Sequence, residues 1–268
     1  MILRGFEAAS NGLLSLIDMN DNIANNIANV NTTGYKKANL TFRNIMDAEV
    51  YNHKGNLIEG ENKYLGNMSL GSQTYQLTYD FSQGCLSKTG NQLDAAIEGD
   101  GFFKIQGADG KISYTRNGSF TINNNSFLVT KEGDYVLDVN NRRIDVNPED
   151  FELGSNRDFI ISEDGTIEIN SRGTRIDLQK IGVFDFSNKE DLFEIGNSKF
   201  IPRTPETNPE LVAEKYTIQQ GHLELSNSNI IKEMINSINT SRNYEALAKT
   251  VKENGTLLTQ AIAVGKIR

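Results

Sequence analysis

The residues best suited to nucleophilic chemistry are one cysteine and two histidines: Cys85, His53 and His222. A thiol nucleophile needs a base within hydrogen-bond reach, and no spacing in the sequence brings either imidazole to the thiol. A single cysteine also cannot form an intrachain disulfide, which is compatible with the cytosol and with an exported protein that uses none. We therefore expect no catalytic dyad.

Three further patterns match known ligand sites only in part. Gly99-Asp100-Gly101 lacks the flanking residues of a P-loop or a dinucleotide-binding loop, and we interpret it as a turn. The stretch from Asp138 begins like a calcium loop, but Arg142 and Arg143 stand where a ligand and the sharp-turn glycine belong. Among the 35 acidic residues, no spacing singles out a carboxylate pair for glycoside hydrolysis. The sequence thus predicts a protein that is not an enzyme and needs no metal or cofactor.

The composition limits the classes of partner. The chain has 268 residues, of which 37% are hydrophobic, and its formal net charge is −8. Because it has no long basic run, nucleic acid and anionic membrane surfaces are poor partners. No stretch approaches the roughly 18 consecutive apolar residues that a membrane-spanning helix needs. The N-terminus lacks the apolar core and cleavage site of a secretory signal, so we expect any export to proceed without signal cleavage.

The first thirty residues repeat with the period of a helix. Apolar or small residues recur at spacings of three, four and seven between residues 3 and 29: Leu3, Phe6, Ser10, Leu13, Ile17, Ala24 and Ile27. Such a stripe is typical of one helix face or of a coiled-coil seam. The turn formers Asn31-Thr32-Thr33-Gly34 predict the end of this helix.

The C-terminal residues repeat the same pattern. Ser226, Ser228 and Asn229 are candidate N-caps. A stripe with steps of three and four follows them: Ile230, Met234, Ser237, Ser241, Tyr244, Ala248, Val251, Gly255, Leu258 and Ile262. A second row of Ile231, Ile235 and Ile238 widens it, and Lys266 and Arg268 suit the helix dipole at the end. We expect Gly255 where a neighbouring backbone comes close, because glycine is otherwise costly in a helix.

Between roughly residues 70 and 220 the pattern is that of β-strands. Short β-branched and aromatic runs alternate with Gly, Asn and Asp turns: 101–105, 119–122, 127–130, 159–161, 166–169 and 181–184. Asp109-Gly110 and Asp164-Gly165 are hairpin turn signals, and no amphipathic helix intervenes. The predicted class is α+β: two long terminal helices, forming a coiled-coil-like pair, flank a mostly antiparallel β-rich centre. The predicted domains are an N-terminal helix (1–34), an extended linker (35–70), a β-rich outer domain (71–220) and a C-terminal helix (221–268).

Two striped helices need more burial than one helix pair offers. Packing supplies most of a helix's stability in water, so part of each stripe is expected to meet other subunits. The N-terminal asparagines either hydrogen-bond across such an interface and fix its register or face water, and composition leaves both open. A heterologous interface whose rotation does not close would give a helical filament.

Three segments together resemble a known family. The first is residues 23–36, IANNIANVNTTGYK. The second joins residues 96–103, AIEGDGFF, to residues 114–120, YTRNGSF. The third is residues 221–229, GHLELSNSN, and continues to residues 242–246, RNYEA. In this order they resemble the bacterial flagellar hook–basal-body rod family, in particular its distal rod protein and the proximal-rod relative.

The resemblance implies an axial protein of the flagellum. In that family paired terminal helices line the inner tube of a helical homopolymer, and the β domain forms its outer layer. The resemblance also implies other flagellar rod and hook proteins as neighbours, and torque transmission from motor to hook. It implies a place in the basal-body rod across the periplasm, reached through the flagellar type III export apparatus without signal cleavage. No cofactor, nucleic acid or membrane insertion is implied.

The predicted assembly interface combines stripe and motif positions. The stripe positions are Leu3, Phe6, Leu13, Ile17, Ile27, Met234, Tyr244, Val251, Leu258 and Ile262. The motif positions, expected to set helix register and the exit turn, are Asn25, Asn26, Asn29, Asn31 and Gly34. Three alternatives remain at this point: a hook-type axial subunit, a monomeric binding module with a helical clasp, and a β-domain hydrolase.

Overall fold

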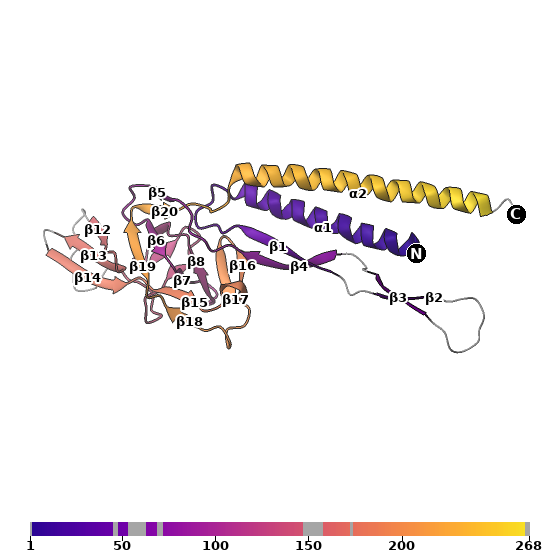
Figure 1. Ribbon diagram of the computed structural model, residues 1–268. Helices are drawn as coiled ribbons and strands as arrows, with labels where there is room; N and C mark the ends of the chain where they lie inside the picture. The colour runs from indigo at the N-terminus through magenta and orange to yellow at the C-terminus, as the bar shows by residue number, and fades with distance from the viewer. Residues whose placement is uncertain are drawn as a thin grey trace. The chain divides into compact units, whose positions relative to one another are not determined.

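The computed structural model describes residues 2–44, 48–52, 63–68, 72–146, 158–171 and 174–265. The chain divides into two compact units, whose elements are labelled in Figure 1. The helical unit comprises Met1–Ile27, Ala38–Leu77 and Ile230–Arg268, and the β unit comprises Ala28–Lys37 and Thr78–Asn229. Some predictions fall outside the described residues: those on His53, Lys266, Arg268 and parts of the 35–70 segment. The side chains of Leu3 and Leu258 are likewise outside the description.

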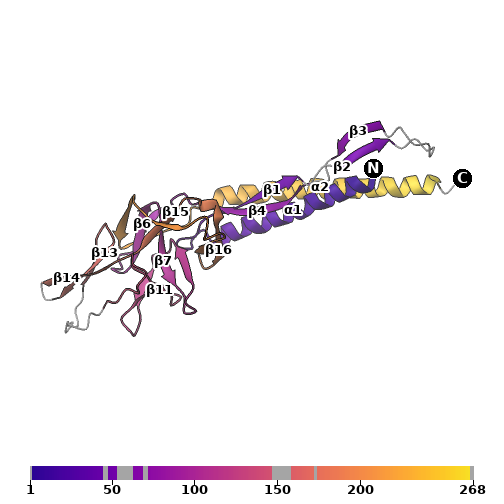
Figure 2. The same cartoon turned by 90° about the horizontal axis from the view of Figure 1, so that it is seen from below.

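The helical unit is built from two long helices and paired strands. Helix α1 (Ile2–Ala28) and helix α2 (Ile230–Gly265) lie side by side and run in opposite directions (Figures 1 and 2). Strand β1 (Ala38–Asn44) pairs with β4 (Ser72–Tyr79), and β2 (Ala48–Asn52) pairs antiparallel with β3 (Lys63–Met68). Both helices were predicted at nearly these bounds, because their 3.6-residue periodicity is strong.

Polar side chains attach α1 to β1 and β4. The amide nitrogens of Asn22 and Asn26 each donate to the carbonyl oxygen of Ala38 at 2.9 Å. The amide oxygen of Asn26 accepts from the backbone nitrogen of Ala38 at 3.0 Å. Thr74 of β4 donates to the Asp18 carboxylate at 2.5 Å. Asn26 therefore satisfies both backbone groups of the first residue of β1, as a neighbouring strand would.

Small and polar side chains take part in the contact between α1 and α2. Thr240, in the first third of α2, is buried, and the Ser237 hydroxyl donates to the Asn20 side chain of α1 at 3.2 Å. A Cβ atom added to Gly12 of α1 would lie 3.1 Å from Leu247 Cδ2. Gly12 of α1 therefore leaves room for the Leu247 side chain of α2.

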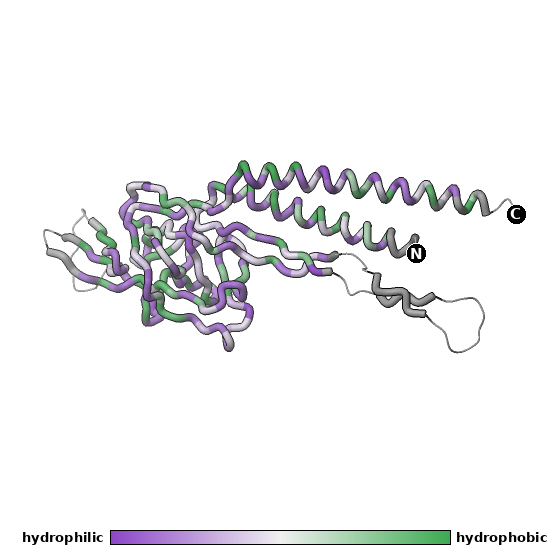
Figure 3. The backbone as a smooth tube through the Cα atoms, viewed as in Figure 1, coloured by the Kyte–Doolittle hydropathy of each residue, from purple (hydrophilic) through white to green (hydrophobic). Residues whose placement is uncertain are grey.

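Hydrophobic positions recur along both helices (Figure 3). Many of their large apolar side chains are exposed, although Ile23 is buried. The exposed ones are Phe6, Leu14, Ile17, Ile230, Ile231, Met234, Ile235, Ile238, Tyr244, Leu257 and Ile262. A coiled coil would bury such side chains between its helices. The predicted fold class is therefore wrong in its coiled-coil-like helix pair; the structure has two terminal helices and a mostly β centre.

The close neighbour expected at Gly255 is not supplied by the described residues of the chain itself. A Cβ atom added there would meet no atom within 4 Å among the described residues, whereas Gly12 is closely approached by Leu247. The sequence pattern cannot distinguish these two helix glycines, because it does not show which helix face meets the neighbour. Neither helix, over the described residues, is apolar enough across a sufficient length to span a bilayer.

The β unit consists of short strands and one 3₁₀ turn. They are β5 (Leu86–Lys88), β6 (Ala95–Gly99), β7 (Phe102–Gln106), β8 (Ile112–Thr115), β9 (Phe120–Ile122), β10 (Leu128–Thr130), β11 (Tyr135–Val136), β12 (Asp158–Ile161), β13 (Thr166–Ser171), β14 (Thr174–Lys180), β15 (Val183–Phe186), η1 (Lys189–Asp191), β16 (Leu192–Gly196), β17 (Lys199–Pro202), β18 (Glu210–Val212), β19 (Tyr216–Gln220) and β20 (His222–Glu224). The large sheet has the order β16-β17-β8-β7-β11-β10-β9, with β15 joining β7 to β18. Smaller sheets are β12-β13-β14, β19-β6 and β20-β5.

The turns and the core follow the predicted pattern. Gly110 and Gly165 have positive φ angles of 83° and 94° in the hairpin turns signalled by Asp109-Gly110 and Asp164-Gly165. The main apolar core lies around Phe103, Ile105 and Ile181, all at most 1% exposed. A second cluster is aromatic and contains Tyr79, Phe81, Phe102, Tyr114, Phe186 and Phe200. Every register within these sheets of the β unit is antiparallel.

Candidate assembly site

The predicted stripe residues divide between two environments. Phe6 and Ile17 of α1 and Met234, Tyr244 and Ile262 of α2 are 40–54% exposed. The half-buried stripe residues are Leu13, Ile27 and Val251. Most of the described stripe residues therefore keep a large exposed surface in the single chain.

Two stripe residues from opposite ends of the sequence meet at one surface hollow. The hollow has a volume of about 230 Å³ and lies between α1 and α2. Its lining includes Leu16, Ile17 and Asn20 from α1 and Thr240, Tyr244 and Glu245 from α2. We call this feature the helix hollow.

The predicted motif asparagines take different roles. Asn26 is buried against the backbone of Ala38, whereas Asn25 and Asn31 are exposed. The Asn29 side-chain oxygen accepts from the Thr32 hydroxyl at 3.1 Å, which orders the turn after α1. The question left open by composition therefore has a divided answer: Asn26 fixes the register of its own chain, and Asn25 and Asn31 lie at the surface.

Gly34 makes the exit turn possible. Its φ angle is +70°, and an added Cβ atom would lie 2.4 Å from the backbone nitrogen of Asn117. Its own backbone nitrogen donates to the carbonyl oxygen of Glu224 at 2.8 Å, and the Thr33 hydroxyl donates to the Asn117 side chain at 3.0 Å. Only glycine fits both the left-handed backbone and this close approach.

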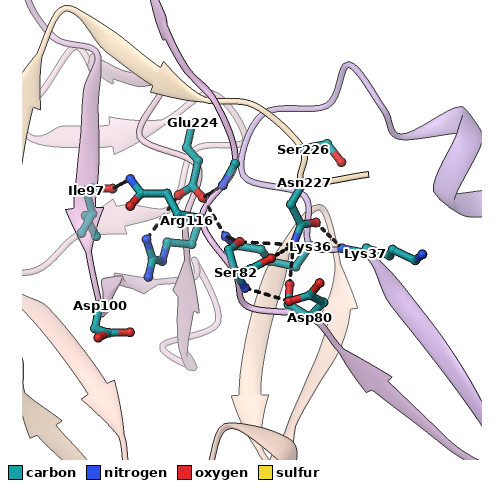
Figure 4. Close-up of polar contacts among 12 residues, drawn as sticks. Lys36, Lys37, Asp80, Ser82, Ile97, Asp100, Arg116, Glu224, Ser226 and Asn227 are labelled. Atoms are coloured by element: carbon teal, nitrogen blue, oxygen red, sulfur yellow. Dashed lines mark hydrogen bonds and ion pairs between the residues drawn. The ribbon is translucent and has the colours of Figure 1, made fainter. Parts of the chain in front are cut away.

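Next to this turn lies a buried ionic cluster, which we call the junction (Figure 4). Lys36 Nζ lies 2.6 Å from Glu224 Oε1, and Arg116 Nη1 lies 3.3 Å from Glu224 Oε2. These three side chains are at most 2% exposed. Lys36 also donates to the carbonyl oxygen of Ser82 at 2.8 Å, and Arg116 donates to that of Gly99 at 2.9 Å. The junction thus joins the segment after α1, the strand β20 and the loop after β8.

The electrostatics of the junction are those of two cations sharing one carboxylate. Burial lowers the pKa of Lys36, and the neighbouring Arg116 guanidinium lowers this pKa further, while Glu224 raises it. Burial likewise lowers the pKa of Arg116 against the raising effect of Glu224. The Arg116 guanidinium also lies over the Phe102 ring, 5.2 Å from its centroid. Glu224 is therefore the group on which both buried cations depend.

Asn227 extends the junction by binding only backbone and hydroxyl groups. Its side-chain oxygen accepts from the Lys37 backbone nitrogen at 2.8 Å. Its amide nitrogen donates to the carbonyl oxygen of Asp80 at 2.7 Å, and it also reaches Ser82 at 3.1–3.2 Å (Figure 4). One side chain thus ties the segment before α2 to the segments that follow α1 and β4.

The junction was not predicted from the sequence. Lys36, Arg116 and Glu224 each stand inside one of the three motifs, and this shared placement of charged residues was the signal available. Residues that could do chemistry are dispersed: Cys85 is exposed, and His222 Nδ1 lies 2.9 Å from the carbonyl oxygen of Gln220. Among the described residues, no three His, Cys, Asp or Glu side chains gather as metal ligands would.

Profiles of flagellar rod and hook proteins match all three segments that carry the motifs. The profile of the flagella basal body rod protein matches residues 21–36, and that of the flagellar hook protein FlgE/F/G D1 domain matches residues 96–169. The profile of the flagellar basal body rod FlgEFG protein C-terminal region matches residues 219–264. Each match supplies one member of the junction, in order Lys36, Arg116 and Glu224.

Relatives align with nearly the whole chain. The flagellar basal-body rod protein FlgG of Borreliella burgdorferi is 33% identical over 266 residues, 96% of this chain and 97% of the relative. The chain belongs to the flagellar basal-body rod protein family. FlgG of Bacillus subtilis is 30% identical over 97% of this chain and 98% of its own length. FlgF of Caulobacter vibrioides is 33% identical over 92% of each.

Membership of the rod protein family decides the class of function. The chain is a structural subunit of the flagellar basal-body rod. Membership favours this interpretation over a monomeric binding module and over a β-domain hydrolase, and it confirms the resemblance drawn from the three motifs.

Proposed function

We propose that this rod subunit polymerises through α1 and α2 into a rigid helical tube that transmits torque from the motor to the hook. The observation that carries the proposal is the exposure of large apolar side chains on both helices, among them Phe6, Ile17, Met234 and Tyr244. The predicted interface also includes the exposed Asn25 and Asn31. It further includes Leu3, near the N-terminal end of α1, and Leu258, near the C-terminal end of α2.

Apolar burial drives this assembly. Removing apolar surface from water contributes about 25 cal/mol per Å², and several bulky side chains on each helix are available for it. That gain offsets the entropy of ordering long helices that lack partners before assembly. Close packing repeated along the axis gives the tube its stiffness.

The wider role follows from the family. The neighbours of the subunit are other copies of itself and, at the ends of its segment, other flagellar rod and hook proteins. The subunit reaches the growing tip through the flagellar type III export apparatus without signal cleavage and lies where the rod crosses the periplasm. No catalytic step or cofactor enters this function.

A charge on the apolar face of α2 tests the proposal. We expect Met234→Lys to raise the concentration needed for polymerisation at least tenfold in sedimentation assays, because the charge would have to be desolvated between copies. Asn243→Lys places the same charge on the same helix at a polar, exposed position and should polymerise within about twofold of wild type. Circular dichroism of each variant monomer, compared with that of wild type, shows whether the substitution itself changes the helix content.

The outcomes separate the alternatives. Equal polymerisation of both variants and wild type would show that the apolar face of α2 is not the interface. A wild-type chain that stays monomeric at high concentration, with both helices protected from proteolysis, would favour the helical clasp of a binding module.

A further inference from the structure

The helix hollow has the size and the lining of a pocket that can receive side chains of another molecule. It is open to the surface, has a volume of about 230 Å³ and is walled by Leu16, Ile17 and Tyr244, with the carboxylate of Glu245 at its lining. A pocket of this size accepts aliphatic side chains, and its acidic lining favours a basic group beside them. Nothing else in the described part of the chain fills it.

A row of side chains on α2 has the complementary chemistry. Ile231, Ile235 and Ile238 are 66%, 52% and 53% exposed, and Arg242 continues the row at the same helical spacing of three and four. Residues at these spacings lie on one helix face. The row is thus apolar for most of its length and ends in a cation.

We propose that the C-terminal end of this row, Ile238 and Arg242, inserts into the helix hollow of a second copy of the chain, with Arg242 against Glu245 of that copy. The inference rests on the proposed polymerisation and names the residues that make the contact. Charge complementarity favours a second copy as the occupant, because the row ends in the cation Arg242 and the acidic Glu245 lines the hollow. The helical unit, with ten basic and ten acidic residues, also carries no net charge that would repel another copy.

The contact has the geometry of an open assembly. Row and hollow are different surfaces, so the interface is heterologous and leaves one free row and one free hollow at its ends. Bringing Arg242 of one copy beside Glu245 of a parallel neighbour displaces the helices by three residues, about 4.5 Å at 1.5 Å per residue. Repetition of this step builds a helix of subunits rather than a closed pair.

An ion pair inside one helix is the competing explanation. Arg242 and Glu245 are three residues apart, and such residues can pair on a single helix surface. An experiment on one variant at a time cannot separate the two explanations, but a mixture of two variants can.

The test uses full-length Arg242→Glu and Glu245→Arg chains in a sedimentation assay. Each variant alone places like charges at the proposed contact, and we expect the polymerisation concentration to rise at least tenfold. In an equimolar mixture, the introduced carboxylate of one chain meets the introduced guanidinium of the other, while the native Arg242 and Glu245 meet at the alternate contacts. Polymerisation of the mixture should therefore return to within about threefold of wild type.

Each outcome of the mixing experiment either supports or overturns the proposed contact. Rescue by mixing supports the contact, because mixing cannot repair a pair within one helix. Wild-type polymerisation of each single variant, or failure of the mixture, overturns the contact while leaving assembly through the helices standing. If wild type itself does not polymerise, the proposed function fails as well.

Cross-linking provides a second measurement that does not depend on charge. In chains carrying Cys85→Ser, Ile238→Cys is placed in one preparation and Ile17→Cys, in the hollow, in the other. We expect a disulfide-linked dimer on oxidation of the mixture and at least tenfold less from either preparation alone. Equal cross-linking of the Ile238→Cys chain with itself would overturn the inference, because that product needs an interface in which row meets row.

Discussion

At the residue scale, the junction shows how a buried charge can specify a fold without being a source of stability. Lys36, Arg116 and Glu224 come from parts of the sequence separated by 80 to 188 residues, and their charges are almost completely removed from water. Desolvation opposes each charge, as the lowered pKa values of Lys36 and Arg116 indicate. The cluster persists only where all three segments are in place, so it selects one arrangement of them.

Loss of the shared carboxylate should therefore destabilise the β unit strongly. We expect Glu224→Gln to lower the free energy of unfolding by about 3–5 kcal/mol, because two buried cations lose their counter-ion. Glu132→Gln, at an exposed turn position, should change it by less than about 0.5 kcal/mol. Urea unfolding monitored by circular dichroism measures both. Adding Lys36→Met to Glu224→Gln should recover part of the loss; equal losses in the single and double variants would contradict the junction.

Tyr114 makes a pH-dependent contribution to the free energy of unfolding. Its hydroxyl donates to the Glu210 carboxylate, and burial, followed by that carboxylate, raises the pKa of Tyr114 far above its ordinary value of 10. The unfolded phenol loses its proton near its ordinary pKa while the folded one keeps it. The stability from this group is therefore fully present below pH 10 and falls as pH rises beyond it, by at most about 1.4 kcal/mol per pH unit.

The Tyr114→Phe variant isolates the contribution of this hydroxyl to the free energy of unfolding. The variant should be less stable than wild type at pH 8 by about 1 kcal/mol, since Glu210 loses a donor. Between pH 10 and 11 the difference between the two proteins should shrink, because only wild type carries the titrating phenol. Urea midpoints measured at intervals of half a pH unit would detect this; a difference independent of pH would contradict the role of Tyr114.

At the element scale, the sequence predicted where the helices and principal strands lie better than it predicted which of their faces pack together. Periodicity predicted both helices and the principal strands, because the apolar pattern of one element is a local property. The face of α2 that meets α1 was not predictable, since polar residues such as Ser237 take part in that contact while many bulkier apolar side chains are exposed. Burial of Glu224 and Arg116 was likewise hidden, because charge pairing across 108 residues leaves no local signal.

The connection after α1 depends on one glycine, and a matched glycine isolates its role. Gly34 and Gly90 both have left-handed φ angles, +70° and +76°, but a Cβ atom at Gly90 meets nothing within 4 Å. We expect Gly90→Ala to cost about 1–2 kcal/mol, the conformational penalty alone. Gly34→Ala should cost roughly 3 kcal/mol or more, because its Cβ atom would also collide with backbone. Thermal unfolding of both variants measures the difference, and equal costs would rule out the close approach to Asn117 as the reason for Gly34.

At the scale of the whole molecule, charge is divided unequally between the two units. The helical unit is neutral, so the entire net charge of −8 belongs to the β unit. In a polymer held together by its helices, the β units of neighbouring copies repel one another. Raising the salt concentration from about 0.01 to 0.1 M shortens the screening length from roughly 30 to 10 Å, and we expect this to lower the polymerisation concentration several-fold.

The attraction proposed between Arg242 and Glu245 would have the opposite salt dependence, so the sign of the effect identifies the larger force. One ion pair per contact, partly shielded by the isoleucine row, should be outweighed by eight uncompensated charges per β unit. Neutralising two exposed carboxylates of that unit, Glu132→Gln with Glu206→Gln, should therefore lower the polymerisation concentration at low salt and weaken its salt dependence. If wild type instead assembled less readily as salt rose, the cross-copy ion pair would dominate, and the β units would have to lie too far apart to repel.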